Sequence, residues 1–136
     1  MSKQSIPYLE EEKYKDLNRA FKIAAMESNY SSQEEIISAA VNMPSRRFWV
    51  TPERLRIVIS AFLNGNDPFV YIKNPLKREM FLELYNRYKA AKENDAYKGL
   101  SLSDICDIIV MQQAPKFYME PSYALKVFYK GRGGRR

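Results

Sequence analysis

The chain has 136 residues, a pI near 9.4 and a formal net charge of +6. It contains no histidine and one cysteine, Cys106, which excludes zinc fingers, His-dependent catalytic triads and intramolecular disulfides. With 46% hydrophobic and 13% aromatic residues, it can bury a core without metals or disulfides, and we expect Cys106 in that core.

A membrane protein is not expected, because no apolar run approaches the roughly 20 residues that a spanning helix needs. The start of the chain, MSKQSIPYLEEEK, lacks the hydrophobic segment of a signal peptide. We therefore expect an intracellular, cytoplasmic protein.

Three helices are predicted in the first half of the chain. The first covers about residues 7–27 and carries apolar residues at helical spacing. The second starts at a capping-box pattern made by Ser32 and Glu35. The third has Thr51 as its N-cap and Pro52 in its first position, and it ends near the turn-rich sequence NGNDP.

The second half repeats this order of helices. Asn74 and Pro75 open the longest helix, which is predicted to end before Gly99. Ser101 and Asp104 repeat the cap pattern ahead of a short apolar helix. A last helix opens at the sequence EPS, after a second aromatic connector.

The two halves align with an offset of 69 residues, which indicates an internal duplication. The sequence FWVTP at 48–52 falls on FYMEP at 117–121, and Ile36 falls on Ile105. We expect an all-α fold of two tandem three-helix repeats packed into one compact unit. The predicted parts are a first repeat (1–64), a linker (65–74), a second repeat (75–130) and a basic disordered tail (131–136).

The positive charge is concentrated in two segments. Residues 45–63 hold four Lys and Arg against one Asp or Glu, and residues 116–136 hold six against one. Cations on corresponding elements of two repeats would form a basic surface that attracts a polyanion such as nucleic acid.

Large aromatic residues lie beside these cations in both connectors, SRRFWV and PKFYM. Phe48 and Phe117 are expected to anchor the connectors in the cores. Trp49 and Tyr118 have two open interpretations: they cover the rim of the core, or they face a ligand together with the neighbouring cations.

The order of helix, capped helix, connector and third helix resembles the tri-helical helix-turn-helix domains of DNA-binding regulators. The resemblance implies that each third helix lies in the major groove with its early residues near base edges. By position, the exposed side would hold Thr51, Glu53, Arg54, Arg56 and Ser60 in the first repeat and Ser122, Tyr123, Lys126 and Lys130 in the second. Phosphates would be reached by Arg46, Arg47 and Lys116, and by the tail residues Lys130, Arg132, Arg135 and Arg136.

One feature departs from that family. Its turns usually have three to four residues, often with glycine, whereas the connector PSRRFWV is longer and has no glycine. A different arrangement of the helices therefore stays open. The whole pattern is also similar to small proteins of phages and mobile elements of gut bacteria. This similarity implies a mobile-element setting in the cytoplasm of a bacterial host cell, with a place in a virion as the alternative, and no particular activity.

Catalysis is not predicted, and neither is a cofactor or a metal. The carboxylate pairs Glu34–Glu35 and Asp104–Asp107 lie near helix starts, where capping explains them, and no glycine-rich phosphate loop is present. We expect a protein that binds DNA, with RNA as an alternative polymer, acting in regulation or as an accessory factor and able to form a homodimer. The alternative is a phage structural or protein-interaction module that binds a phage protein and touches nucleic acid only through its tail.

Overall fold

The structure is a computed structural model and describes residues 6–27 and 32–133. The predicted all-α class is confirmed: these residues form six α-helices and two short 3₁₀ turns, and contain only one isolated β-bridge. The elements are α1 (Ile6–Met26), α2 (Gln33–Val41), α3 (Pro52–Leu63), η1 (Pro68–Val70), α4 (Pro75–Lys92), η2 (Asp95–Tyr97), α5 (Leu102–Ile109) and α6 (Pro121–Gly133).

The predicted helix starts are confirmed where they are described. The Ser32 hydroxyl accepts the Glu35 N–H at 3.2 Å at the start of α2, and Thr51 caps α3. Ser101 and Asp104 form a reciprocal capping box on α5, with two bonds of 3.1 Å. Local hydrogen-bonding chemistry therefore fixes where these helices begin.

Two predicted boundaries are corrected, and a short turn lies within the predicted linker. The α4 helix ends at Lys92 rather than just before Gly99, and η2 follows it because the Asn94 side chain caps this turn. The linker expected at 65–74 contains the 3₁₀ turn η1. The α6 helix continues to Gly133, into the segment expected to be a disordered tail; each of its two glycines, Gly131 and Gly133, costs a helix only about 1 kcal/mol.

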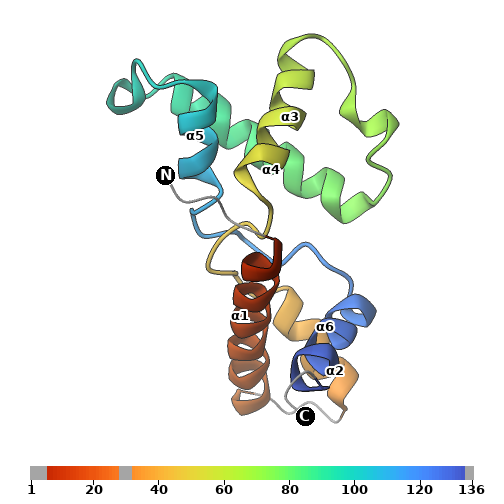
Figure 1. The fold of residues 1–136 in the computed structure, drawn as a ribbon. Coiled ribbons are helices and arrows are strands. Elements are labelled where there is room, and N and C mark those ends of the chain that lie inside the picture. Colours follow the sequence, from red (N-terminus) through yellow and green to blue (C-terminus); the bar gives the residue numbers. More distant parts are fainter. Residues whose placement is uncertain (1–5, 28–31, 134–136) are drawn as a thin grey trace. The chain divides into compact units, whose positions relative to one another are not determined.

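The helices form two compact units that differ from the two expected repeats. Unit 1 comprises residues 1–49 and 113–136, and unit 2 comprises residues 50–112. In unit 1, α6 packs against α1 and α2, and in unit 2, α3 packs against α4 and α5 (Figure 1). Each half of the chain therefore contributes two helices to one unit and its third helix to the other. The expected division into contiguous blocks, 1–64 and 75–130, is not the one observed.

The long connectors account for this exchange of third helices. Residues 42–51 separate α2 from α3, and residues 110–120 separate α5 from α6. Ten extended residues can reach about 30 Å, whereas a tight turn would hold the third helix beside the second. Within unit 1 the connectors meet at Ser45 and Ala114, whose backbones exchange hydrogen bonds of 3.0 and 3.1 Å. These two residues are 69 positions apart, the offset at which the halves of the sequence align.

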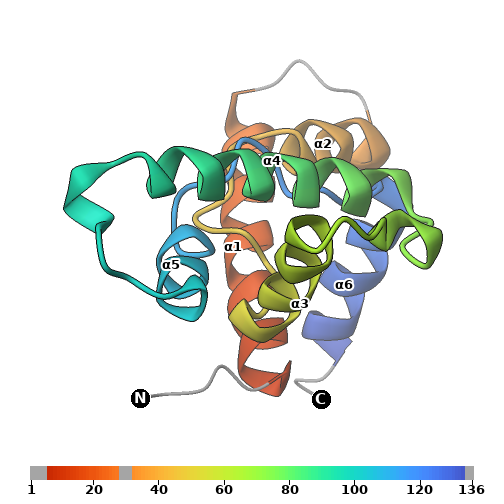
Figure 2. The same ribbon diagram turned by 90° about the horizontal axis from the view of Figure 1, so that it is seen from above.

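Each unit has its own apolar core. In unit 1 the ring of Phe128 on α6 lies 4.8 Å from the ring of Phe21 on α1. In unit 2, α4 runs across α5 and α3 (Figure 2), and Cys106 is buried on α5 as expected. No helix in the described residues is long and apolar enough to cross a membrane. The main buried residues are Leu17, Ala20, Ile37, Ala40, Phe117 and Ala124 in unit 1, and Leu55, Val58, Ile59, Leu84, Ile105 and Ile109 in unit 2.

Candidate nucleic-acid interface

The first connector is held by Asp16, a buried carboxylate on α1 that the sequence analysis did not single out. One of its oxygens accepts the Arg19 Nε and Nη2 donors at 2.9 and 2.6 Å. The other accepts the Arg46 backbone N–H at 2.8 Å and the Trp49 indole N–H at 3.0 Å. Asp16 is 1% exposed, so four donors from three residues meet at a site with almost no water. Such a node fixes the connector on α1.

Two of the predicted contact residues, Arg47 and Trp49, belong to this internal structure. Arg47 is only 5% exposed, its Nε donates to the Phe48 carbonyl at 2.9 Å, and its guanidinium lies 5.1 Å from the Trp49 ring centre. Burial lowers the pKa of Arg47, and the carbonyl and the ring partly replace the lost water. The expectation that Arg47 reaches phosphates is therefore corrected, because its head group is enclosed. Trp49 is half-buried against the core of unit 1.

The second connector repeats this geometry. The Lys116 ammonium lies 5.5 Å from the centre of the Tyr118 ring, as Arg47 lies over Trp49 in the first connector. Tyr118 is 9% exposed and stacks on Phe48 at 6.1 Å. Its φ of 56° is in the left-handed region, a strain that costs about 1 kcal/mol or more and persists only where packing holds it. Tyr118 is thus a packing residue of unit 1, and the idea that it faces a ligand is corrected.

Arg46 differs from its neighbour in the first connector. Its side chain is 65% exposed, and its Nε lies 3.8 Å from the Asp16 carboxylate, at the edge of ion-pair range. Its backbone is fixed by the bond to Asp16, while most of its guanidinium donors face solvent. Arg46 is therefore available to an anion.

The α3 helix presents a mixed surface. Its buried side is apolar, and helical periodicity places Glu53 and Ile57 on the opposite ridge, with Arg54 and Arg56 on the two flanks. The Arg54 guanidinium lies 5.8 Å from the centre of the Tyr71 ring. Two further predicted residues of this helix, Thr51 and Ser60, are half-buried, and the Thr51 hydroxyl is engaged as a cap.

The α6 helix presents a basic and polar surface. Ser122, Tyr123 and Lys126 are exposed, and the helix contains no Asp or Glu. From α1, the Lys13 ammonium lies 5.5 Å from the Tyr123 ring centre and pairs with Glu10 at 2.9 Å. Lys130 and Arg132 belong to the last turns of α6, while Arg135 and Arg136 lie outside the described residues.

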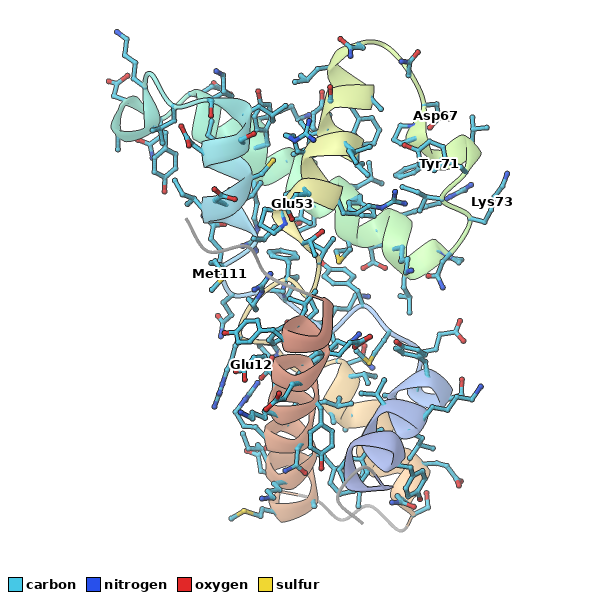
Figure 3. All side chains as sticks on the ribbon, in the orientation of Figure 1. Glu12, Glu53, Asp67, Tyr71, Lys73 and Met111 are labelled. Atoms are coloured by element: carbon cyan, nitrogen blue, oxygen red, sulfur yellow. The ribbon has the colours of Figure 1, made fainter. Side chains whose placement is uncertain are left out.

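The two units differ in charge. Unit 1 contains thirteen Lys and Arg against eight Asp and Glu, and unit 2 contains nine against eight. Several acids of unit 1 are already paired: Glu10 with Lys13, and Glu11 and Glu12 with Lys15 (Figure 3 labels Glu12). Almost all of the net positive charge therefore belongs to unit 1.

Residues suited to hold a metal do not gather in the described part of the chain, where no group of three or more Cys, Asp or Glu side chains could share an ion. Asp104 acts in the α5 capping box. The Cys106 thiol is buried and its pKa is raised to about 11, mainly by burial. A thiol of this kind is a weak nucleophile.

No family model, curated protein or solved structure matches this chain.

Proposed function

We propose that the chain binds duplex DNA through unit 1. The exposed side of α6 lies against the duplex, and the basic residues at the end of the sequence contact the DNA phosphate backbone. In this proposal α6 is the third helix of a helix-turn-helix-like unit that it completes with α1 and α2. Such a protein fits a regulatory or accessory role in a phage or mobile element, in the cytoplasm of its bacterial host.

The contrast between the two third helices carries this proposal. The α6 helix exposes Lys126 and Ser122 and contains no carboxylate between Pro121 and Gly133; the exposed Glu120 lies just before its first residue. The α3 helix exposes Glu53 and Ile57 at the two aligned positions. By sequence, α6 carries three Lys and Arg and no Asp or Glu, whereas α3 carries two Arg and one Glu. Because binding to the phosphate backbone depends on the balance of cations and acids that face it, α6 is the better DNA-binding helix.

Two more observations support unit 1. Arg46 offers a largely exposed guanidinium on a backbone that Asp16 holds in place, so only its side chain has to be ordered on binding. Tyr123 is exposed beside Lys13 and Lys126, and a ring with cations next to it suits a sugar-phosphate or base contact.

Fluorescence anisotropy with a labelled duplex over a salt series tests the proposal. For Lys126→Ala and for Arg46→Ala we expect weaker binding and a log K against log salt slope that is shallower by about 0.9 each. Arg56→Ala is the matched control, since Arg56 is an exposed arginine on α3, and it should leave the slope unchanged.

Equal weakening by Arg56→Ala and Lys126→Ala would contradict the assignment to unit 1. Binding that is lost only when residues 134–136 are removed would reduce the contact to nonspecific attachment. An RNA duplex of the same sequence in a parallel titration decides between the polymers, because its deep, narrow groove does not admit a helix.

A further inference from the structure

The α6 helix is joined to the rest of unit 1 by a short segment of the second connector. The Phe117 N–H donates to the Val41 carbonyl at 3.0 Å, so the connector is fixed to unit 1 up to this residue. The α6 helix then begins at Pro121. Residues 118–120 are therefore all that separates a fixed point of the connector from the helix, and we call them the α6 hinge.

The α6 hinge is strained at Tyr118. Within residues 6–27 and 32–133, Tyr118 is the only non-glycine residue with a positive φ, at 56°, and the aligned Trp49 of the first connector does not share it. The left-handed region is unfavourable for such a residue because its Cβ comes close to the following carbonyl oxygen. Short hinges under strain favour the exchange of an element between two copies of a protein, since opening the hinge releases the strain while the element keeps its contacts.

The fold already contains one exchange of a third helix. The α3 helix leaves α1 and α2, to which residues 42–51 join it, and packs against α4 and α5 in unit 2. The α6 helix is likewise separated in sequence from α1 and α2, because all of unit 2 lies between them. Contacts rather than a direct chain connection therefore hold α6 on its partners (Figure 1), and an identical helix from a second copy can make the same contacts.

Side-chain sizes in the two cores match each third helix to its own helix pair. In unit 1 the core contains Ile37 of α2 and Ala124 of α6. At the aligned positions, unit 2 contains the smaller Cys106 on α5 and the larger Leu55 on α3. A large residue on the helix pair thus accompanies a small one on the third helix, and the reverse holds in the other unit.

A second set of aligned positions also differs in size. In unit 1, Ala40 of α2 accompanies the large Phe128 of α6, whereas in unit 2, Ile109 of α5 accompanies Ile59 of α3. Placed on α4 and α5, Phe128 would overfill a core that already holds Ile109, and overpacking destabilises a core. A released α6 therefore has one kind of acceptor, an α1–α2 pair, in its own chain or in a second copy.

We propose that two copies of the chain form a dimer by exchanging α6. The α6 hinge of each copy opens, and each α6 packs on α1 and α2 of the other copy with the contacts that it makes in the structure. Tyr118 leaves the left-handed region in this form, so the dimer is relieved of strain at two hinges. The exchange leaves the exposed side of α6 unchanged, so it goes beyond DNA binding by unit 1 and does not depend on it.

Mixed single-cysteine variants test the exchange. The Tyr129 hydroxyl on α6 donates to Gln33 Oε1 on α2 at 2.7 Å, so Gln33→Cys and Tyr129→Cys place one thiol on each of two neighbouring helices. The two variants are incubated together at about 1 mM, the order of the effective concentration of a tethered segment, and then treated with a short bismaleimide. We expect a covalent dimer.

Gln33→Cys alone and Tyr129→Cys alone are the matched controls. Chance collisions would link each of them as often as the mixture, whereas exchange of α6 brings together only the two different thiols. Cys106 is buried and stays unreacted in the folded chain.

Sedimentation equilibrium of two Tyr118 variants tests the hinge. Tyr118→Gly and Tyr118→Ala both lose the ring that stacks on Phe48, but only glycine adopts a positive φ without strain. We expect the wild type to dimerise at about 0.1 mM, and the Tyr118→Gly dimer to have a dissociation constant at least about tenfold higher than the Tyr118→Ala dimer. Circular dichroism and Trp49 fluorescence verify that each variant is folded.

Three results would overturn the proposal. The first is a wild type that stays monomeric at about 1 mM. The second is a dimer in which the mixed variants link no more than each variant alone, which would assign the contact to another surface. The third is an equal dissociation constant for the two Tyr118 dimers. No DNA is present in these experiments, so a failure here is distinct from a failure of DNA binding.

Discussion

The exchange of third helices can be tested by removing the Phe128 side chain. The ring is 5% exposed and lies 4.8 Å from Phe21 and 6.3 Å from Tyr14, both on α1. A buried Phe→Ala change costs about 3–5 kcal/mol, from lost apolar contact and the cavity left behind. With a urea m-value of about 1–3 kcal/mol/M, the unfolding midpoint of unit 1 should fall by about 1 M or more.

The chain carries one natural reporter in each unit. Trp49 is the only tryptophan and is bonded to Asp16 in unit 1, so its fluorescence follows the unfolding of that unit. Cys106 is the only cysteine and is buried in unit 2, so the rate of its alkylation follows the opening of that unit. Phe128→Ala should shift the Trp49 transition and leave Cys106 protected at low urea.

The mirror-image variant is Ile59→Ala on α3. Ile59 is fully buried in unit 2, and the change should cost about 2–5 kcal/mol there. It should speed the alkylation of Cys106 and leave the Trp49 transition in place. Contiguous repeats require the opposite pairing, with Phe128 supporting the α4–α5 pair. If Phe128→Ala exposes Cys106 while Trp49 keeps its transition, the exchanged arrangement is refuted.

Three smaller predictions concern single groups. Asp16→Ala should destabilise unit 1 by about 3–5 kcal/mol in urea unfolding, because it leaves buried hydrogen-bond donors without an acceptor. The control Glu83→Ala breaks a half-exposed ion pair with Arg87 and should cost under about 1 kcal/mol. Equal costs would show that Asp16 is not a structural node. Ser101→Ala removes half of the α5 capping box and should cost about 1 kcal/mol in the same assay. Because burial raises the pKa of Cys106 to about 11, the thiol of the unfolded chain ionises at a lower pH than that of the folded chain. The free energy of unfolding should therefore be unaffected by this thiol below pH 9.0 and fall between pH 9.0 and about 11. In Cys106→Ala this contribution to the fall of unfolding free energy with pH should be absent.

The helix starts could be predicted because they depend on neighbouring residues alone. Ser32, Thr51 and Ser101 cap the helices that follow them through bonds to N–H groups three residues away. The partners of the third helices could not be predicted in this way, since α3 and α6 bury the same apolar faces in either arrangement. The available signal was the length of PSRRFWV, which is too long for a tight turn and reaches another unit.

The candidate site was only partly predictable. Strand-like alternation separates Arg47 from Phe48 and Val50, but all three are buried, while Arg46 is 65% exposed. The connector is not a regular strand, and its direction is set by Asp16, 30 residues earlier than Arg46. A lone Asp inside an amphipathic helix carries no local sign of that role. The net charge of the sequence indicated a basic surface. How that charge is divided between units 1 and 2 depends on which unit contains α3 and which contains α6.

The two third helices combine similar buried faces with different exposed faces. Val58 and Val127 align at the 69-residue offset; Val58 is buried and Val127 is partly buried. At the exposed positions the aligned residues differ: Glu53 corresponds to Ser122, and Ile57 corresponds to Lys126. Substitutions at exposed helix positions cost little stability, about 0.5 kcal/mol or less, while buried positions tolerate few changes. Two copies of one scaffold can therefore diverge on their surfaces and keep their packing. The exposed ridges of α3 and α6 show such a difference: α3 exposes Glu53 and Ile57 where α6 exposes Ser122 and Lys126, and in the proposed function only the α6 ridge contacts DNA.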